Sequence, residues 1–129
     1  MTYDEKLAEI VGTIGRKTLA GEVTWSVSPL AADAGAFLTY LGDINVIIRA
    51  VHTDVHEAPD DAYDIELVLR DVAGAPIESI RDTRLKHNLF SVRGYSSWFA
   101  FLEDVLETAR RQALGTEKAI DTLLERLRS

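Results

Sequence analysis

The stretch AFLTYLGDINVIIRAV, residues 36–51, contains two apolar runs that are separated only by Gly42 and Asp43. Both runs carry β-branched or aromatic side chains and are bounded by turn-forming residues, which is typical of strands. Because two residues are the usual loop of a tight antiparallel hairpin, the stretch predicts paired strands at 36–41 and 44–52.

Further strands are expected on both sides of the hairpin. Residues 23–27, VTWSV, alternate apolar and polar side chains with the period of a half-buried strand. Residues 63–72, YDIELVLRDV, alternate in the same way, and residues 77–80 can pair back after the turn AGAP. Four or five strands in this order predict an antiparallel meander.

A helix is expected before the sheet. The hydroxyl of Thr2 can cap its first turn while Glu5 reaches back, and Gly21 can end it. Gly12 and Gly15 interrupt the helix, and their lack of a Cβ suits close packing against another element. The stripe expected to be buried comprises Tyr3, Leu7, Ile10, Val11 and Ile14.

Two more helices are expected after the sheet. Ser96 or Ser97 can cap the first of them, Gly115 can end it, and Thr116 is expected to cap the second. Both have an apolar stripe that is expected to face inward. The stripes are Trp98, Leu102, Val105, Leu106, Ala109 and Ala113 in the first helix, and Ala119, Ile120, Leu123, Leu124 and Leu127 in the second.

This order of elements predicts a single α+β domain over residues 1–129, with the two C-terminal helices packed on one face of a four- or five-stranded sheet. The apolar share of 47% and the charged share of 27% are those of a globular chain. A chain of 129 residues can bury a sizeable core without a disulfide or a metal. No cofactor is expected.

The charge and the cysteine content exclude several classes of function. The formal net charge is −7, which disfavours contact with nucleic acid and with anionic membranes. The absence of cysteine excludes disulfides, thiolate metal sites and cysteine nucleophiles. The acidic start does not resemble a signal peptide and no apolar run is long enough to span a membrane, so a cytoplasmic protein is expected.

Three residues at the end of the hairpin raise the question of a metal site. His52, Asp54 and His56 alternate along the chain, and neighbouring members would lie about 7 Å apart on one strand face. Histidine and carboxylate suit zinc or iron, so His52 with Asp54, or Asp54 with His56, could chelate. The competing interpretation, which we adopt, is a strand that leaves the core and enters a solvated loop without a metal.

Residues 81–95 form a basic segment in an otherwise acidic chain. They contain Arg81, Arg84, Lys86 and Arg93 against a single acid. Such a segment could bind an anionic ligand or an acidic partner. It could equally be a surface connection whose charges keep it soluble, or the complement of the acidic loop at 54–66.

Apolar residues beyond the needs of one core predict an interface. Ile47 and Val68 lie on the second face of the expected sheet, and Phe99 and Phe101 flank the stripe of the aromatic helix. A monomer would leave such residues partly exposed, and exposed apolar patches usually mark contact sites. We therefore expect a homodimer, or a complex with a protein partner, built on this helix or on an open sheet edge.

Two segments carry a resemblance to a family. KTLAGEVTW, residues 17–25, and ARRQALGTEKAIDTLLERL, residues 109–127, resemble segments of a family of small uncharacterised bacterial proteins. The resemblance covers the end of the first helix up to Trp25 and the two C-terminal helices. It implies a bacterial source and the same fold class, and it implies no activity and no site residues.

Three functions remain open. The chain has no P-loop, no G-x-G-x-x-G, no G-x-S-x-G and no H-E-x-x-H motif. The leading hypothesis is a non-catalytic interaction or accessory domain of adaptor, chaperone-like or immunity-like type. The alternatives are a domain that senses an anionic small molecule through the basic segment, and a metal-dependent enzyme that uses His52 and Asp54.

Overall fold

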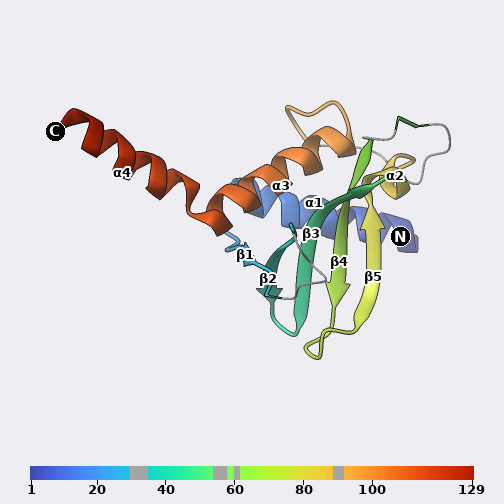
Figure 1. Ribbon diagram of the computed structural model, residues 1–129. Coiled ribbons are helices and arrows are strands. Elements are labelled where there is room, and N and C mark those ends of the chain that lie inside the picture. The colour runs from blue at the N-terminus through green and yellow to red at the C-terminus, as the bar shows by residue number, and fades with distance from the viewer. Residues whose placement is uncertain (30–34, 54–57, 60–61, 89–91) are drawn as a thin grey trace.

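A five-stranded antiparallel sheet forms the centre of the structure (Figure 1). The structure is a computed structural model that describes residues 1–29, 35–53, 58–59, 62–88 and 92–129. In chain order the elements are α1 (Tyr3–Leu19), β1 (Ser26–Val27), β2 (Phe37–Leu41), β3 (Ile44–His52), β4 (Tyr63–Arg70), β5 (Pro76–Arg81), α2 (Asp82–Leu85), α3 (Trp98–Leu114) and α4 (Thr116–Arg128).

The strands follow one another across the sheet in the order β1-β2-β3-β4-β5, and every neighbouring pair is antiparallel. The predicted hairpin joins β2 to β3: Leu41 pairs with Ile44, and Gly42 adopts a positive φ of 62° in the turn between them. The fold class is thus confirmed, with an N-terminal helix, an antiparallel meander and two C-terminal helices in an α+β arrangement.

The first strand is shorter than expected. A strand is predicted over residues 23–27, and β1 comprises only its last two residues, Ser26 and Val27. The backbone N–H of Trp25 donates to Oε1 of Gln112 on α3 at 2.8 Å, so it is not available to a neighbouring strand. The indole Nε1 of Trp25 donates to Oγ1 of Thr18 on α1 at 3.0 Å. Trp25 therefore ties the two large helices to the sheet instead of extending it.

Helices α1 and α3 cover the same sheet face and meet at the glycines of α1. A Cβ on Gly15 would lie 2.3 Å from Cζ of Phe101, which confirms the expected close packing at this glycine. Tyr3 and Ile10, expected in the buried stripe of α1, are 57% and 40% exposed, so the buried stripe is narrower than predicted. The main core between helices and sheet contains Leu7, Val11, Ile14, Trp25, Phe37, Val46, Ile48, Ile65, Leu67, Ile80, Leu85, Phe101, Leu102 and Val105.

The last helix departs from its expected position. Gly115 ends α3 in the left-handed conformation, with a φ of 63°, and α4 begins at the next residue. Thr116 is therefore the first residue of α4 and not its cap. In Figure 1, α4 extends from the end of α3 away from the sheet. The structure describes every residue of α4 and none of them is buried, so its apolar stripe does not face inward as expected.

Candidate interaction surface

The exposed apolar stripe of α4 is the most unusual surface of the described chain. Ile120, Leu123, Leu124 and Leu127 have exposed fractions of 58%, 52%, 42% and 74%. Their spacing of three and four residues places all four side chains on one side of the helix. Single exposed apolar residues are common, whereas a contiguous stripe on a projecting helix is typical of a contact site.

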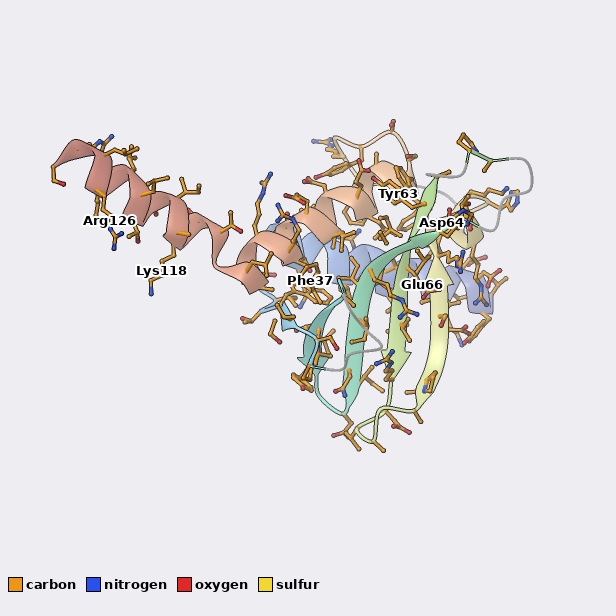
Figure 2. All side chains as sticks on the ribbon, in the orientation of Figure 1. Phe37, Tyr63, Asp64, Glu66, Lys118 and Arg126 are labelled. Atoms are coloured by element: carbon orange, nitrogen blue, oxygen red, sulfur yellow. The ribbon has the colours of Figure 1, made fainter. Side chains whose placement is uncertain are left out.

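Charged residues surround this α4 stripe. At 100° per residue, Arg126 and Arg128 lie on the two flanks of the stripe, and Lys118 lies on the opposite side of the helix. Figure 2 shows Lys118 and Arg126 projecting from α4 at a distance from the body. The formal charges of α4 cancel, because it carries the acids Glu117, Asp121 and Glu125 and the bases Lys118, Arg126 and Arg128.

A second apolar surface lies on the body of the molecule, between α1 and the hairpin end of the sheet. It is a groove of about 430 Å³ that is open to solvent. Ile10 on α1 and Leu41 at the end of β2 are each 40% exposed at this groove. We call it the α1–hairpin groove, and it is lined by Glu9, Ile10, Thr13, Ile14, Leu41, Ile44, Val46 and Leu69.

The opposite face of the sheet carries a network of charges around two buried carboxylates. Glu66 on β4 is 6% exposed, and its carboxylate accepts hydrogen bonds from Nη2 of Arg49 at 2.8 Å and from Nε of Arg81 at 3.3 Å. Nη1 of Arg81 also donates to Oδ2 of Asp64 at 3.2 Å. Figure 2 labels both carboxylates on β4. Because each charge has a partner in the sheet, the network serves to hold three strands in register.

Two of the four basic residues proposed as an anion site are paired with carboxylates. Arg81 belongs to the sheet network, and Arg84 pairs with Oε1 of Glu78 at 3.0 Å and with Oδ1 of Asp4 at 3.4 Å. Lys86 and Arg93 are exposed. The two arginines are thus paired with carboxylates from other elements, and the anion-binding hypothesis stays a prediction.

The environment of Asp82, at the start of α2, combines burial with a hydrogen bond. Oδ1 of Asp82 accepts the backbone N–H of Ile65 at 2.8 Å, and the residue is 7% exposed. Burial raises the pKa of the Asp82 carboxyl above its ordinary value, although the hydrogen bond from Ile65 acts in the opposite direction. A contrasting case is Glu78, whose pKa is lowered by the hydroxyl of Tyr3, which donates to it at 2.6 Å.

The proposed metal ligands are only partly within the structure. His52 ends β3 with an exposed ring, and its Nδ1 lies 2.8 Å from the carbonyl oxygen of Thr53. Asp54 and His56 lie outside the described residues. Over the part of the chain that the structure describes, no three histidine, aspartate or glutamate side chains gather in a way that could hold a metal ion.

The four residues expected at an interface are largely within the body. Phe101 is fully buried against α1, and Phe99 is half-buried, with its ring centroid 5.5 Å from that of Tyr63. Ile47 and Val68 are 1% and 3% exposed and form a second buried cluster with Ala36 and Leu38. The expectation that a monomer exposes Ile47, Val68 and Phe101 is therefore corrected, and exposed apolar surface lies on α4 and at the α1–hairpin groove instead.

The sequence pattern predicts the apolar stripe of α4, but the expectation that this stripe belongs to the core is wrong. A helical period shows where the apolar side of a helix is, and it does not show what covers that side. The available signal was Gly115, which leaves no linker between α3 and α4, so that α4 cannot easily fold back onto the sheet. The exposure of Ile10 had no counterpart in the sequence pattern.

Comparison of the chain with models of protein families, with curated proteins and with solved structures gave no match. None of the helices in the described part of the chain combines the length and the apolar character that crossing a bilayer requires. The geometry on α4 and beside α1 is therefore the basis for the functional proposal.

Proposed function

We propose that the protein is a non-catalytic interaction domain of the adaptor or accessory type, and that it works by protein–protein association through α4. The observation that carries the proposal is the stripe of Ile120, Leu123, Leu124 and Leu127 on a helix with no buried residue. A helix of 13 residues gains little stability from its own hydrogen bonds in water, and most helices of this length are stabilised by packing of an apolar side. A protein partner supplies that packing.

The chemistry of the stripe favours a protein over a membrane as the partner. Helices that lie on anionic membranes usually carry a strongly basic polar side. The charges of α4 cancel, and the formal charge of −7 resides on residues 1–115, which anionic lipid would repel. An apolar stripe with mixed charges on its flanks is instead typical of helices that bind in protein grooves.

The experiment compares two double variants that introduce the same change in charge. Leu123→Glu with Leu127→Glu places two acids on the stripe, whereas Lys118→Gln with Thr122→Glu makes the same change on the opposite side of α4. Circular dichroism should show that both variants keep the fold, because all four residues are exposed.

Association is then measured by analytical ultracentrifugation of each pure protein, and by quantitative affinity isolation from the cells that naturally contain it. We expect the opposite-side variant to keep the self-association or the partner of the unmodified protein, and the stripe variant to lose it. Equal association of all three proteins, or no association of the unmodified protein with itself or with any other protein, would show that α4 is not an interaction helix.

A further inference from the structure

The molecule presents two apolar surfaces that no element of the described chain covers: the α4 stripe and the α1–hairpin groove. We propose that they are complementary, and that the α4 stripe of one protein molecule binds in the α1–hairpin groove of a second copy while the second copy does the same in return. This inference rests on the proposed function and names the partner of α4. The result is a closed dimer with exchanged C-terminal helices.

The groove and the helix match in chemical character. Six aliphatic side chains line the groove, and the stripe presents four. Ile10 and Leu41 are the partly exposed side chains of the groove, and an apolar side chain from α4 would cover them. A helix over the groove would bury apolar surface on both partners, which is the main driving force for association.

The charges at the edges also match. Glu9 lines the groove, and Glu5 lies one turn earlier on the exposed side of α1. The last turn of α4 places Arg126 and Arg128 on the flanks of its stripe. An α4 helix that lies along α1 therefore brings its basic last turn to an acidic edge, which helps to fix its direction.

Reciprocal exchange of the α4 helices covers more of the exposed apolar surface than a contact between two α4 helices does. A helix of 13 residues is about 20 Å long, so one contact between two α4 helices covers only part of the roughly 1,200 Å² that a stable complex buries. Two helix–groove contacts cover both stripes and both grooves. The second contact also forms within an existing complex, so it requires no further loss of translational freedom.

Binding of α4 to the groove of its own chain does not fit the observed geometry. Gly115 is the only residue between α3 and α4, and its left-handed conformation directs α4 away from the body (Figure 1). No residue of α4 lines the α1–hairpin groove. A second copy can approach that groove without any change at Gly115.

The absence of cysteine makes the arrangement directly testable in the full-length chain, because every thiol is then an introduced one. One preparation carries Ile10→Cys in the groove together with an affinity tag, and another carries Leu127→Cys on the stripe. Both positions are exposed, so neither change should disturb the fold. The two preparations are mixed, allowed to exchange, and treated with a short bismaleimide.

We expect a crosslinked heterodimer as the main product, and about tenfold less of it when Lys118→Cys, on the opposite side of α4, replaces Leu127→Cys. The unmodified protein should sediment as a dimer. A third preparation carries Ile10→Cys and Leu127→Cys in the same chain. Three results would each overturn the inference: a predominant crosslink between two Leu127→Cys chains, a crosslink within single chains of the third preparation, or no crosslink at all. If such a result occurs while a partner still depends on the α4 stripe, the proposed function stands and only the exchanged dimer is rejected.

Discussion

The ring of Phe101 lies directly on the backbone of Gly15, so that a Cβ at Gly15 would be 2.3 Å from its Cζ atom and 2.6 Å from its Cε2 atom. Phe101 is fully buried and has no room to move away, because it also contacts the rings of Tyr95 and Trp98. This contact sets the distance between α1 and α3, and with it the position of α3 over the sheet.

The substitution Gly15→Ala should therefore destabilise the protein by about 2 kcal/mol, because overpacking a well-filled core forces side chains or backbone to shift. Gly12→Ala is the matched control on the same helix. Its Cβ would meet the ring of Trp98 at 3.7 Å and the flexible end of Arg16 at 3.4 Å, so it should be tolerated, with a gain of up to about 1 kcal/mol in helix propensity. Urea denaturation measures both, and equal stability of the two variants would contradict the packing argument.

Removal of the charge of Glu66 should also be costly. Glu66→Gln leaves Arg49 and Arg81 without a shared anionic partner on a partly buried sheet face, and we expect a loss of about 2 kcal/mol in the free energy of unfolding. Glu107→Gln is the control, since Glu107 also joins two arginines but on the exposed side of α3. Its loss should be much smaller, and a loss equal to that of Glu66→Gln would show that burial of the network has no effect.

The pH dependence of stability should change in a defined direction in Asp82→Asn. Because burial raises the pKa of Asp82 in the folded state, the folded protein holds this proton more tightly than the unfolded chain does. The contribution of Asp82 to stability is therefore present at low pH and is lost as the pH rises through the folded-state pKa. The amide introduced by Asp82→Asn would keep an oxygen that can accept the N–H of Ile65, but it does not titrate in this pH range.

As the pH rises from about 3 to about 6, the unfolding free energy of Asp82→Asn should therefore increase relative to that of the unmodified protein. Glu78→Gln should behave in the opposite way, because the pKa of Glu78 is lowered and its contribution is lost as the pH falls. Urea denaturation at several pH values measures both slopes. Slopes of the same sign for the two variants would contradict the assignment.

Deletion of residues 116–129 should leave the body folded. All residues of the main core precede Gly115, so at low concentration the free energy of unfolding should change by no more than about 0.5 kcal/mol. The full-length chain should melt at a higher temperature as its concentration rises, because association stabilises the folded state by mass action. The shortened chain should lack this dependence. Calorimetry at two concentrations about a hundredfold apart provides the measurement, and a shortened chain that fails to unfold cooperatively would disprove the prediction.

Local signals predicted the fold well. The pair Gly42 and Asp43 defines the hairpin by itself, and Gly115 ends α3 as expected, because both depend on the conformation of a few consecutive residues. The candidate sites depended on contacts between distant parts of the chain. The carboxylates that neutralise Arg81 and Arg84 come from β4, β5 and the first turn of α1, and no pattern within residues 81–95 specifies them.

The difference between local signals and long-range contacts also explains why the expected exposure of the interface residues was wrong. Alternation along β3 and β4 shows that Ile47 and Val68 share a face, but it does not show that Ala36 and Leu38 join them in a buried cluster. The helical period of α4 likewise shows which side of the helix is apolar, but it does not show whether another element covers that side. Sequence patterns thus predicted which side chains are apolar on which face, and the structure was needed to show which of those faces are covered.

The meander order of the sheet has a consequence for the order of folding. Each strand pairs with the next one in the chain, whereas α1 and α3 meet only when the two ends of the chain close over the sheet. Because closure of a long loop costs more chain entropy than formation of a hairpin, we expect the strands to pair before Gly15 and Phe101 come together. Phe101→Leu should then accelerate unfolding and leave the folding rate nearly unchanged, while Ile48→Val should slow folding; stopped-flow measurements with the opposite result would reverse this order. If the strands pair first, the apolar face of the sheet is open to water until the helices pack on it, and we expect the chain to be most prone to aggregate at that stage.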